Sequence, residues 1–192
     1  MSTNPSATTM LREEHRLILR VAGALERLLD SAAGGEPDWM ALERSVEFLR
    51  RFADLCHHGK EEDLLFTELE DQGLPRDTGP IAVMLHEHRQ GRALVQAMDR
   101  ALAGAREADE AAMARLVNAG RDYVDLIRGH IRKEDDVLFA MADQMVVGPA
   151  CRRLCDAYQD ACARRFEGAT KDQLEALGEE IVAAGARSAE DR

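Results

Sequence analysis

An internal repeat constrains the fold of this 192-residue chain more than any other feature. Residues 57–66 read HHGKEEDLLF and residues 130–139 read HIRKEDDVLF, so a His-x-x-x-Glu motif recurs after 73 residues (130 − 57). The tripeptide Glu-His-Arg occurs at residues 14–16 and again at residues 87–89, at the same offset. The chain therefore contains two copies of one unit, and each copy supplies a lone His and a His-x-x-x-Glu motif.

Apolar residues recur every three or four positions through both copies, which is the spacing of a helix with one buried face. Ala, Leu, Glu and Arg are abundant and aromatic residues make up only 4% of the chain, which favours helix over strand. We expect helices over about residues 8–32, 38–71, 80–106 and 109–145, with Asp38 as an N-cap and Pro80 in a first turn. The predicted fold is all-α: an antiparallel four-helix bundle with one or two further helices over residues 150–185.

Glycine and proline divide the chain into three parts. We predict a flexible N-terminus over residues 1–9, a bundle over residues 10–147 and a C-terminal helical extension over residues 148–192. The tail of the extension, from Ala186 onward, is expected to fray. The extension either covers the bundle or forms a homodimer contact, and the sequence leaves the oligomeric state open.

Ionisable residues interrupt the apolar stripe of each expected bundle helix. Burying an unpaired carboxylate costs on the order of several kcal/mol, so it needs a partner, and a metal ion is one. A His and a Glu four residues apart lie on the same face of a helix, where both can reach one metal or two adjacent metals. The predicted metal ligands are His15, His57, Glu61, His88, His130 and Glu134.

The repeat also selects between neighbouring histidines. Adjacent residues on an α-helix point about 100° apart, so only one of His57 and His58 can face the core. His57 has a His counterpart in the second copy, and His58 does not. Likewise His88 has a His counterpart in the first copy, and His86 does not. We therefore expect His58 and His86 to lie outside the coordination sphere or at the surface.

The simplest arrangement places His15 and His57 on one metal and the two histidines of the second copy on another, with Glu61 and Glu134 bridging. Mixed imidazole and carboxylate ligation suits iron or manganese better than a structural zinc site. Bridging carboxylates also suit a metal that changes its oxidation state. The predicted cofactor is therefore two iron ions, with zinc or manganese less favoured.

These motifs resemble the hemerythrin-like, or HHE cation-binding, family over about residues 10–145. The likeness rests on Glu14-His15 and on residues 56–66, 79–92 and 130–139. It implies an antiparallel four-helix bundle around an oxo- or hydroxo-bridged di-iron centre. Oxygen-carrying hemerythrins have two histidines one turn apart on the third helix, whereas Met84 and Arg92 stand one turn either side of His88 here. That missing imidazole argues against reversible oxygen carriage.

The function predicted from these features is a non-haem di-iron protein that binds or reacts with a small oxidant: dioxygen, peroxide or nitric oxide. One form is an enzyme with peroxidase-like, catalase-like or nitric oxide reductase activity. The alternative is an iron-handling protein, redox sensor or iron–sulfur repair protein without turnover, and a third is a structural metal bundle. Tyr123, two turns before His130, either donates a hydrogen bond to a bound ligand or is an ordinary buried side chain.

The composition disfavours several partners. The chain carries 36 acidic against 25 basic residues, a formal net charge of −11, which argues against binding nucleic acid or anionic membranes. No stretch approaches the roughly 20 apolar residues of a membrane helix, and the first ten residues lack the apolar run of a secretory signal. We expect a cytoplasmic protein with reduced thiols.

Two further sets of residues have no assigned role in the site. Cys151, Cys155 and Cys162 share one face of a C-terminal helix and are expected to pack as small buried thiols, with a redox role left open. Lys60 and Lys133 correspond in the repeat and are expected to form exposed ion pairs with acids three or four residues away.

Overall fold

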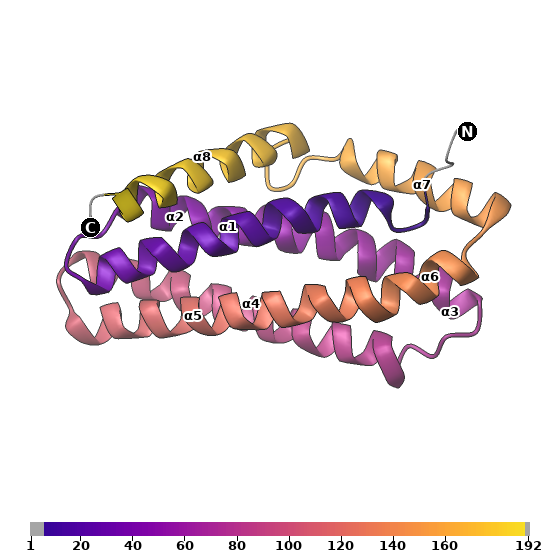
Figure 1. Ribbon diagram of the computed structural model, residues 1–192, viewed down its shortest axis with the longest axis horizontal. Coiled ribbons are helices and arrows are strands. Elements are labelled where there is room, and N and C mark those ends of the chain that lie inside the picture. The colour runs from indigo at the N-terminus through magenta and orange to yellow at the C-terminus, as the bar shows by residue number, and fades with distance from the viewer. Residues whose placement is uncertain (1–5, 191–192) are drawn as a thin grey trace.

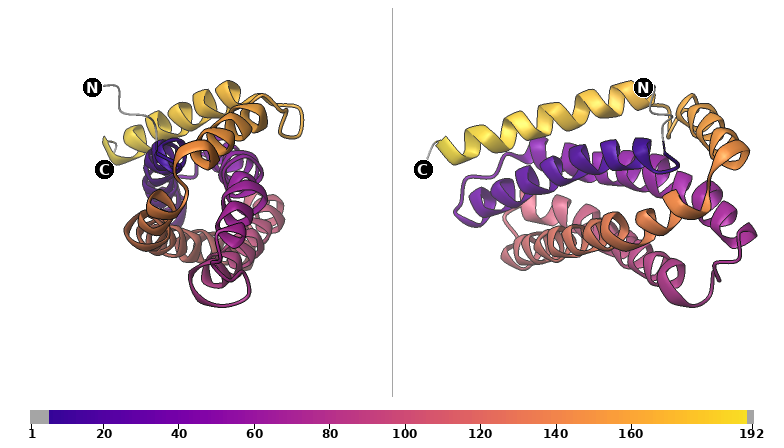
Figure 2. Two further views of the ribbon diagram at one scale, coloured as in Figure 1. Left: turned by 90° about the vertical axis from the view of Figure 1, so that its right-hand side faces the viewer. Right: turned by 45° about the vertical axis from the view of Figure 1, so that its right-hand side comes forward.

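Four long helical segments form the body of the protein in a computed structural model, which describes residues 6–190 and the side chains of residues 6–188. The first is α1 (Thr9–Ala33) and the third is α4 (Gly79–Arg106). The second segment comprises α2 (Trp39–Phe48), η1 (Leu49–His58), η2 (Glu61–Leu65) and α3 (Phe66–Asp71). The fourth comprises α5 (Glu110–Lys133), η3 (Glu134–Leu138) and α6 (Phe139–Met145). The segments alternate in direction around a common axis (Figures 1 and 2), which confirms the predicted all-α bundle.

Capping residues fix where the helices begin and end. The carboxylates of Asp38 and Asp109 accept hydrogen bonds from backbone amides in the first turns of α2 and α5. Pro80 lies in the first turn of α4, where its missing amide hydrogen has no partner to lose. Gly35 follows α1 with a φ of 94°, a conformation that favours glycine. The four predicted bundle helices are confirmed to within about one residue at each end.

Three π-helical stretches interrupt the second and fourth segments. The stretches η1 and η2 lie in the second segment, and η3 lies at the corresponding place in the fourth. A π-turn closes its backbone hydrogen bond after five residues instead of four and so widens the helix locally. The stretches η2 and η3 begin at the glutamates of the two His-x-x-x-Glu motifs, 73 residues apart, whereas the equivalent of η1 in the fourth segment is α-helical.

The hydrophobic core has two parts. The larger part lies toward the connections between α1 and α2 and between α4 and α5, and it includes Leu25, Phe48, Phe52 and Val124. The smaller part lies at the other end of the bundle, and it includes Leu11, Phe66, Leu69 and Phe139. The ionisable residues of the repeat fall between the two parts along the chain, so apolar layers enclose them from both ends.

The extension forms two helices, α7 (Gly148–Cys162) and α8 (Lys171–Glu190), along the outer side of the first two bundle segments (Figure 2). Leu174 and Ile181 of α8 belong to the larger core, and Leu154 of α7 belongs to the smaller core. The extension therefore covers the bundle within one chain. A homodimer contact through its outer face stays a prediction.

At both ends of the described chain, the structure has a helix or a tertiary contact where the sequence predicted fraying or flexibility. The predicted fraying from Ala186 onward is wrong as far as residue 190, because α8 continues to Glu190. Residues 1–5 of the predicted flexible N-terminus lie outside the described residues. In the remainder of that segment Thr8 is buried, and its hydroxyl donates to the carboxylate of Asp143 at 3.0 Å.

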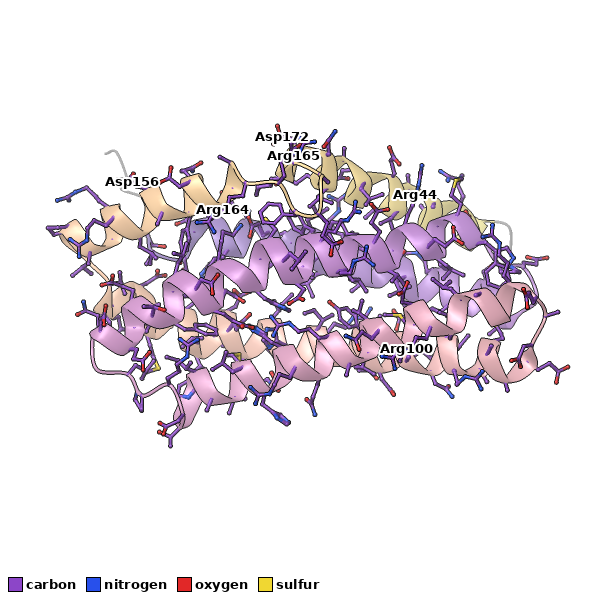
Figure 3. The ribbon with its side chains drawn as sticks, turned by 180° about the vertical axis from the view of Figure 1, so that it is seen from behind. Arg44, Arg100, Asp156, Arg164, Arg165 and Asp172 are labelled. Atoms are coloured by element: carbon purple, nitrogen blue, oxygen red, sulfur yellow. The ribbon has the colours of Figure 1, made fainter. Side chains whose placement is uncertain are left out.

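Charged side chains cover the outside of the bundle and of the extension. Figure 3 shows Asp156, Arg165 and Asp172 on the outer side of α7, α8 and their connection. Within residues 6–190 no helix combines the length and the apolar character that a membrane crossing requires.

The packing of α8 on α1 predicts the effect of a methyl group at Gly185. A Cβ there would lie 2.8 Å from the Cα of Ala24, so the two backbones would have to separate. We expect Gly185→Ala to lower the free energy of unfolding by about 1–3 kcal/mol, the usual cost of overpacking. Gly129→Ala in α5 is the matched control, since its Cβ would meet nothing within 4 Å. Denaturant unfolding measures both, and equal midpoints for Gly185→Ala and the unmodified protein would contradict this packing.

Candidate metal centre

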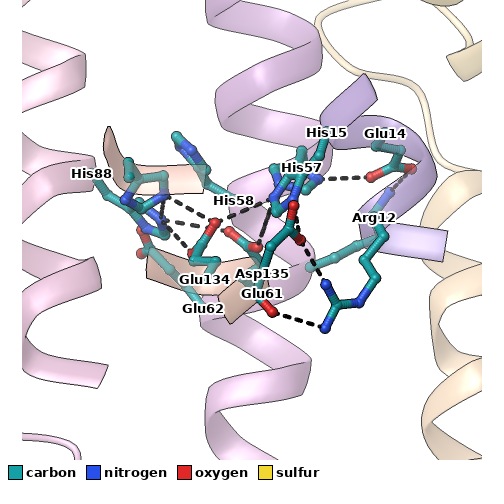
Figure 4. A network of polar contacts seen from close by, with 12 residues as sticks. Arg12, Glu14, His15, His57, His58, Glu61, Glu62, His88, Glu134 and Asp135 are labelled. Atoms are coloured by element: carbon teal, nitrogen blue, oxygen red, sulfur yellow. Dashed lines mark hydrogen bonds and ion pairs between the residues drawn. The ribbon is translucent and has the colours of Figure 1, made fainter. Parts of the chain in front are cut away.

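The six residues predicted as metal ligands converge at the middle of the bundle. All are buried, with relative exposures of 0–2%. They come from every bundle segment and are, in chain order, His15 on α1, His57 in η1, Glu61 in η2, His88 on α4, His130 on α5 and Glu134 in η3. Figure 4 shows the site from close by.

The two glutamates occupy the centre of this group. Glu61 places one carboxylate oxygen 3.3 Å from Nε2 of His57 and the other 3.5 Å from Nε2 of His88. Glu134 places one oxygen 3.2 Å from Nε2 of both His15 and His130. Each carboxylate thus faces histidines of both copies of the repeat, as a bridging ligand would.

Every one of the four histidines has its other ring nitrogen bound to a further carboxylate. Nδ1 of His15 lies 3.0 Å from the carboxylate of Asp135, and Nδ1 of His57 lies 2.9 Å from that of Glu14. Nδ1 of His88 lies 2.7 Å from the carboxylate of Glu62, and Nδ1 of His130 lies 3.0 Å from that of Glu87. A carboxylate accepts, so Nδ1 carries the proton and Nε2 presents its lone pair to the centre. This is the orientation that a metal-binding imidazole requires.

These outer carboxylates were not singled out in the sequence, although the repeat contains them. Glu14 and Glu87 are 73 residues apart, and so are Glu62 and Asp135. Each pair stands directly beside a predicted ligand in the two copies. The repeat could therefore have identified these carboxylates, because it preserves an acidic residue beside the ligands as well as the ligands themselves.

The expectation that only one of His57 and His58 faces the core is wrong. His58 is buried rather than at the surface, with 4% exposure, and its ring stacks on that of His88 with centroids 3.8 Å apart. Its Nδ1 lies 3.4 Å from the carboxylate of Asp54, which is long for a hydrogen bond. Burial, followed by the nearby His88, lowers the pKa of His58 well below its ordinary value. A neutral, buried imidazole of this kind is suited to binding a metal.

The reason for the correction is the local backbone. The prediction assumed α-helical geometry, in which neighbours point about 100° apart. Residues 49–58 are π-helical, so each turn contains more residues and the angle between neighbours is smaller, and both His57 and His58 are buried. A fifth imidazole, from the second segment, therefore lies beside the four predicted histidine ligands.

The charges at the centre fit a bound cation. All four carboxylate oxygens of Glu61 and Glu134, and Nε2 of His15, are buried without a hydrogen-bond partner among the described residues. Burial, together with the neighbouring Glu61, raises the pKa of Glu134 to about 8. Two ionised carboxylates this close and this deep would destabilise the fold unless positive charge lay between them. A bound metal ion would give these buried atoms the partner that they lack among the described residues, so the donor set fits a metal.

Two overlapping groups of ligand atoms lie within 4.8 Å of one another, and each could hold one metal ion. The first consists of His15, His57, Glu61 and Glu134, and the second of His58, Glu61, His88 and His130. The histidines divide between the groups as the sequence predicted, with His58 added to the second. Glu61 belongs to both groups, which is the geometry expected of a bridging carboxylate.

The structure also bears on the expectations for the two repeated lysines and for His86. Lys60 does not form the predicted local ion pair: it is buried and its Nζ lies 2.5 Å from Glu14, 46 residues away. Lys133 is exposed as expected, but its partner is Glu87, also 46 residues away, so the expected local partner is wrong for both lysines. His86 is exposed, in line with the sequence analysis. Tyr123 is buried, and whether it meets a bound ligand stays a prediction.

Tyr158 of α7 was missed by the sequence analysis. Its hydroxyl is buried without a hydrogen-bond partner in the described part of the chain. Burial, followed by the charge of Glu61, raises its pKa well above the ordinary value. Because α7 lies outside the repeat, no offset in the sequence could have associated this residue with the site.

Comparisons with known proteins agree with this geometry. A family model described as the hemerythrin HHE cation binding domain matches residues 6–142. Uncharacterized protein Rv1995 of Mycobacterium tuberculosis is 27% identical over 160 residues, which cover 81% of this chain and 61% of the relative. The iron-sulfur cluster repair protein DnrN of Neisseria gonorrhoeae is 37% identical over 91 residues, 45% of this chain and 56% of that protein. The chain spans about three fifths of the length of the curated relatives it matches, and no solved structure matches it.

Replacing Glu134 by Gln should have opposite effects with and without metal. In protein stripped by a chelator, the change removes a buried carboxylate that has no partner, so we expect a gain of about 1–3 kcal/mol in the free energy of unfolding. In metal-loaded protein the change removes a ligand, and we expect the variant to unfold more readily than the unmodified chain. Thermal unfolding in both states measures this. The same sign in both states would show that the carboxylate does not serve a cation.

Proposed function

Since the chain belongs to the hemerythrin HHE cation-binding family, we propose that it is a non-haem di-iron protein that binds or reacts with a small oxidant. The observation that carries the proposal is the pair of buried carboxylates, Glu61 and Glu134, enclosed by five inward-facing imidazoles. Mixed nitrogen and oxygen ligation of this kind favours iron over structural zinc. Two iron ions would supply electrons and Lewis acidity to dioxygen, peroxide or nitric oxide.

A cavity borders the centre on the side of His58. It measures about 260 Å³ and lies between the second segment, α4 and α5. His58 belongs to its lining, so one edge of the centre faces this space. Apolar side chains, among them Val46, Leu49 and Val95, form much of the wall. A small neutral or weakly polar molecule is the kind of ligand that such a wall admits.

The size of the cavity supports the same conclusion. Pockets for drug-sized ligands measure roughly 300–1,000 Å³, and this cavity is smaller than that range. Arg92 in its wall donates to Asp54 at 2.7 Å and to Glu62 at 2.8 Å. Because Glu62 in turn holds His88, the charged part of the wall is tied to the ligand sphere. The cavity thus has a largely apolar wall and a polar part held in place by ion pairs.

A second candidate function rests on a relative. The gonococcal protein that shares 37% identity over part of this chain is named an iron–sulfur cluster repair protein. An iron-handling or redox-sensing role without turnover would use the same centre. Rapid decay of added peroxide or nitric oxide, abolished by His130→Ala, favours an enzyme. Tight retention of iron without turnover favours the sensor or repair role.

Metal analysis with an optical spectrum tests the proposal directly. We expect protein produced with ample iron to carry two iron ions per chain and to show charge-transfer absorption between a bridging oxygen and ferric iron. His86→Ala is a control that should leave both unchanged, because His86 is exposed. Stoichiometric zinc under the same conditions would overturn the di-iron proposal.

Narrowing the cavity should slow the entry of the oxidant without disturbing the metals. A Cβ at Gly91 would lie 3.6 Å from the Tyr123 ring, an ordinary contact, so Gly91→Ala is tolerated and serves as control. Gly91→Leu extends into the cavity, and we expect the reaction with peroxide or nitric oxide to slow by roughly tenfold or more. Stopped-flow absorbance measures the rate. Unchanged rates at unchanged iron content would show that the oxidant enters elsewhere.

A further inference from the structure

A pair of cysteines lies outside the metal centre, on the side covered by the extension. Cys56 belongs to η1 and is fully buried, and Cys162 is the last residue of α7. Their sulfur atoms lie 3.5 and 3.6 Å from the same atom, Nζ of Lys60. Cys162 also donates to the thioether sulfur of Met10 at 3.7 Å. Residues more than a hundred positions apart in the chain therefore meet around one buried ammonium group.

The charged groups around the pair favour a thiolate at Cys162. The hydrogen bond from Cys56 lowers the pKa of Cys162 to about 6, against the opposing effect of burial and with the help of Lys60. Lys60 is held in place by Glu14, whose carboxylate lies 2.5 Å from its Nζ. A thiolate beside a fixed cation is the reactive form of cysteine.

We propose that Cys56 and Cys162 form an oxidation-sensitive dithiol pair that a peroxide converts to a disulfide. Cys162 is the attacking residue because it is partly exposed, whereas Cys56 is fully buried and is in place to resolve the product. The inference does not rest on the metal centre or on its proposed function. It assigns a modification site to Cys56 and to Cys162, the second of which the sequence analysis expected to pack as a small buried thiol.

The chemistry balances in two steps. The Cys162 sulfur attacks one oxygen of hydrogen peroxide, the O–O bond breaks, and the departing hydroxide takes up a proton to leave as water. The product is a sulfenic acid at Cys162. The Cys56 sulfur then attacks the Cys162 sulfur, the S–O bond breaks, and hydroxide leaves as water with the proton of the Cys56 thiol. Two thiols are oxidised by two electrons, and one peroxide is reduced to two waters.

The chain offers an internal comparison on the same helix. Cys151 and Cys155 lie one turn apart on α7 and interact with each other. Burial and the neighbouring Cys151 raise the pKa of Cys155 to about 11, so its thiolate is scarce at neutral pH. These two thiols should therefore react more slowly than the Cys56–Cys162 pair, although both pairs belong to one molecule.

Peptide mapping of the full-length, metal-containing protein tests the proposal. The protein is treated with hydrogen peroxide or, in parallel, with diamide, which oxidises thiols without any metal, and free thiols are then alkylated. We expect a Cys56–Cys162 linked peptide in at least roughly tenfold excess over any Cys151–Cys155 linkage, reversed by dithiothreitol. A dominant Cys151–Cys155 linkage, or equal alkylation of all four cysteines after treatment, would overturn it.

Two variants assign the roles within the pair. In Cys56→Ser we expect oxidation to stop at the sulfenic acid of Cys162, which dimedone traps as a mass adduct. In Cys162→Ser we expect Cys56 to stay reduced. Cys155→Ser is the matched control and should leave the yield of the Cys56–Cys162 disulfide unchanged. A dimedone adduct on Cys56 in the unmodified protein would reverse the assigned roles and contradict the proposal.

Discussion

Two carboxylates buried in an apolar bundle set the constraint on which the rest of the structure depends. Glu61 and Glu134 are fully enclosed, and their oxygens have no hydrogen-bond partner among the described residues. An apolar core of this kind is stable only if positive charge compensates them. The inward histidines, the wide turns around them and the apolar layers above and below all follow from placing those two charges at the same point.

The carboxylates around the centre join the two halves of the chain into one unit. Within each half, the acid before the lone His holds the His of the His-x-x-x-Glu motif: Glu14 holds His57, and Glu87 holds His130. Between halves, the contacts cross: Glu62 holds His88, and Asp135 holds His15. Each half therefore orients a histidine of the other, and neither half can arrange its ligands alone. This explains why the spacing between ligands is repeated together with the identity of their neighbours.

The extension makes the two halves unequal. Lys60 and Lys133 occupy equivalent positions and bind equivalent glutamates, yet the side chain of Lys60 is 1% exposed and that of Lys133 is 45% exposed. The difference arises because α7 ends beside Lys60 at Cys162, whereas the side chain of Lys133 stays exposed to solvent. His58 adds a second asymmetry, since its counterpart is Ile131. The cavity lies on the side of His58 and the thiol pair on the side of α7, so a symmetric centre has two distinct surroundings.

The sequence by itself determined the helices, their ends, and the six residues that meet at the centre, because a period of three to four and a 73-residue offset are properties of the order of residues alone. The tertiary structure decided the position of His58, since the sequence pattern does not reveal that residues 49–58 widen into a π-helix and turn it inward. It also decided the burial of Lys60 and the meeting of Cys56 with Cys162. Those contacts join segments with no shared repeat, and only the packing of α7 against η1 brings them within reach.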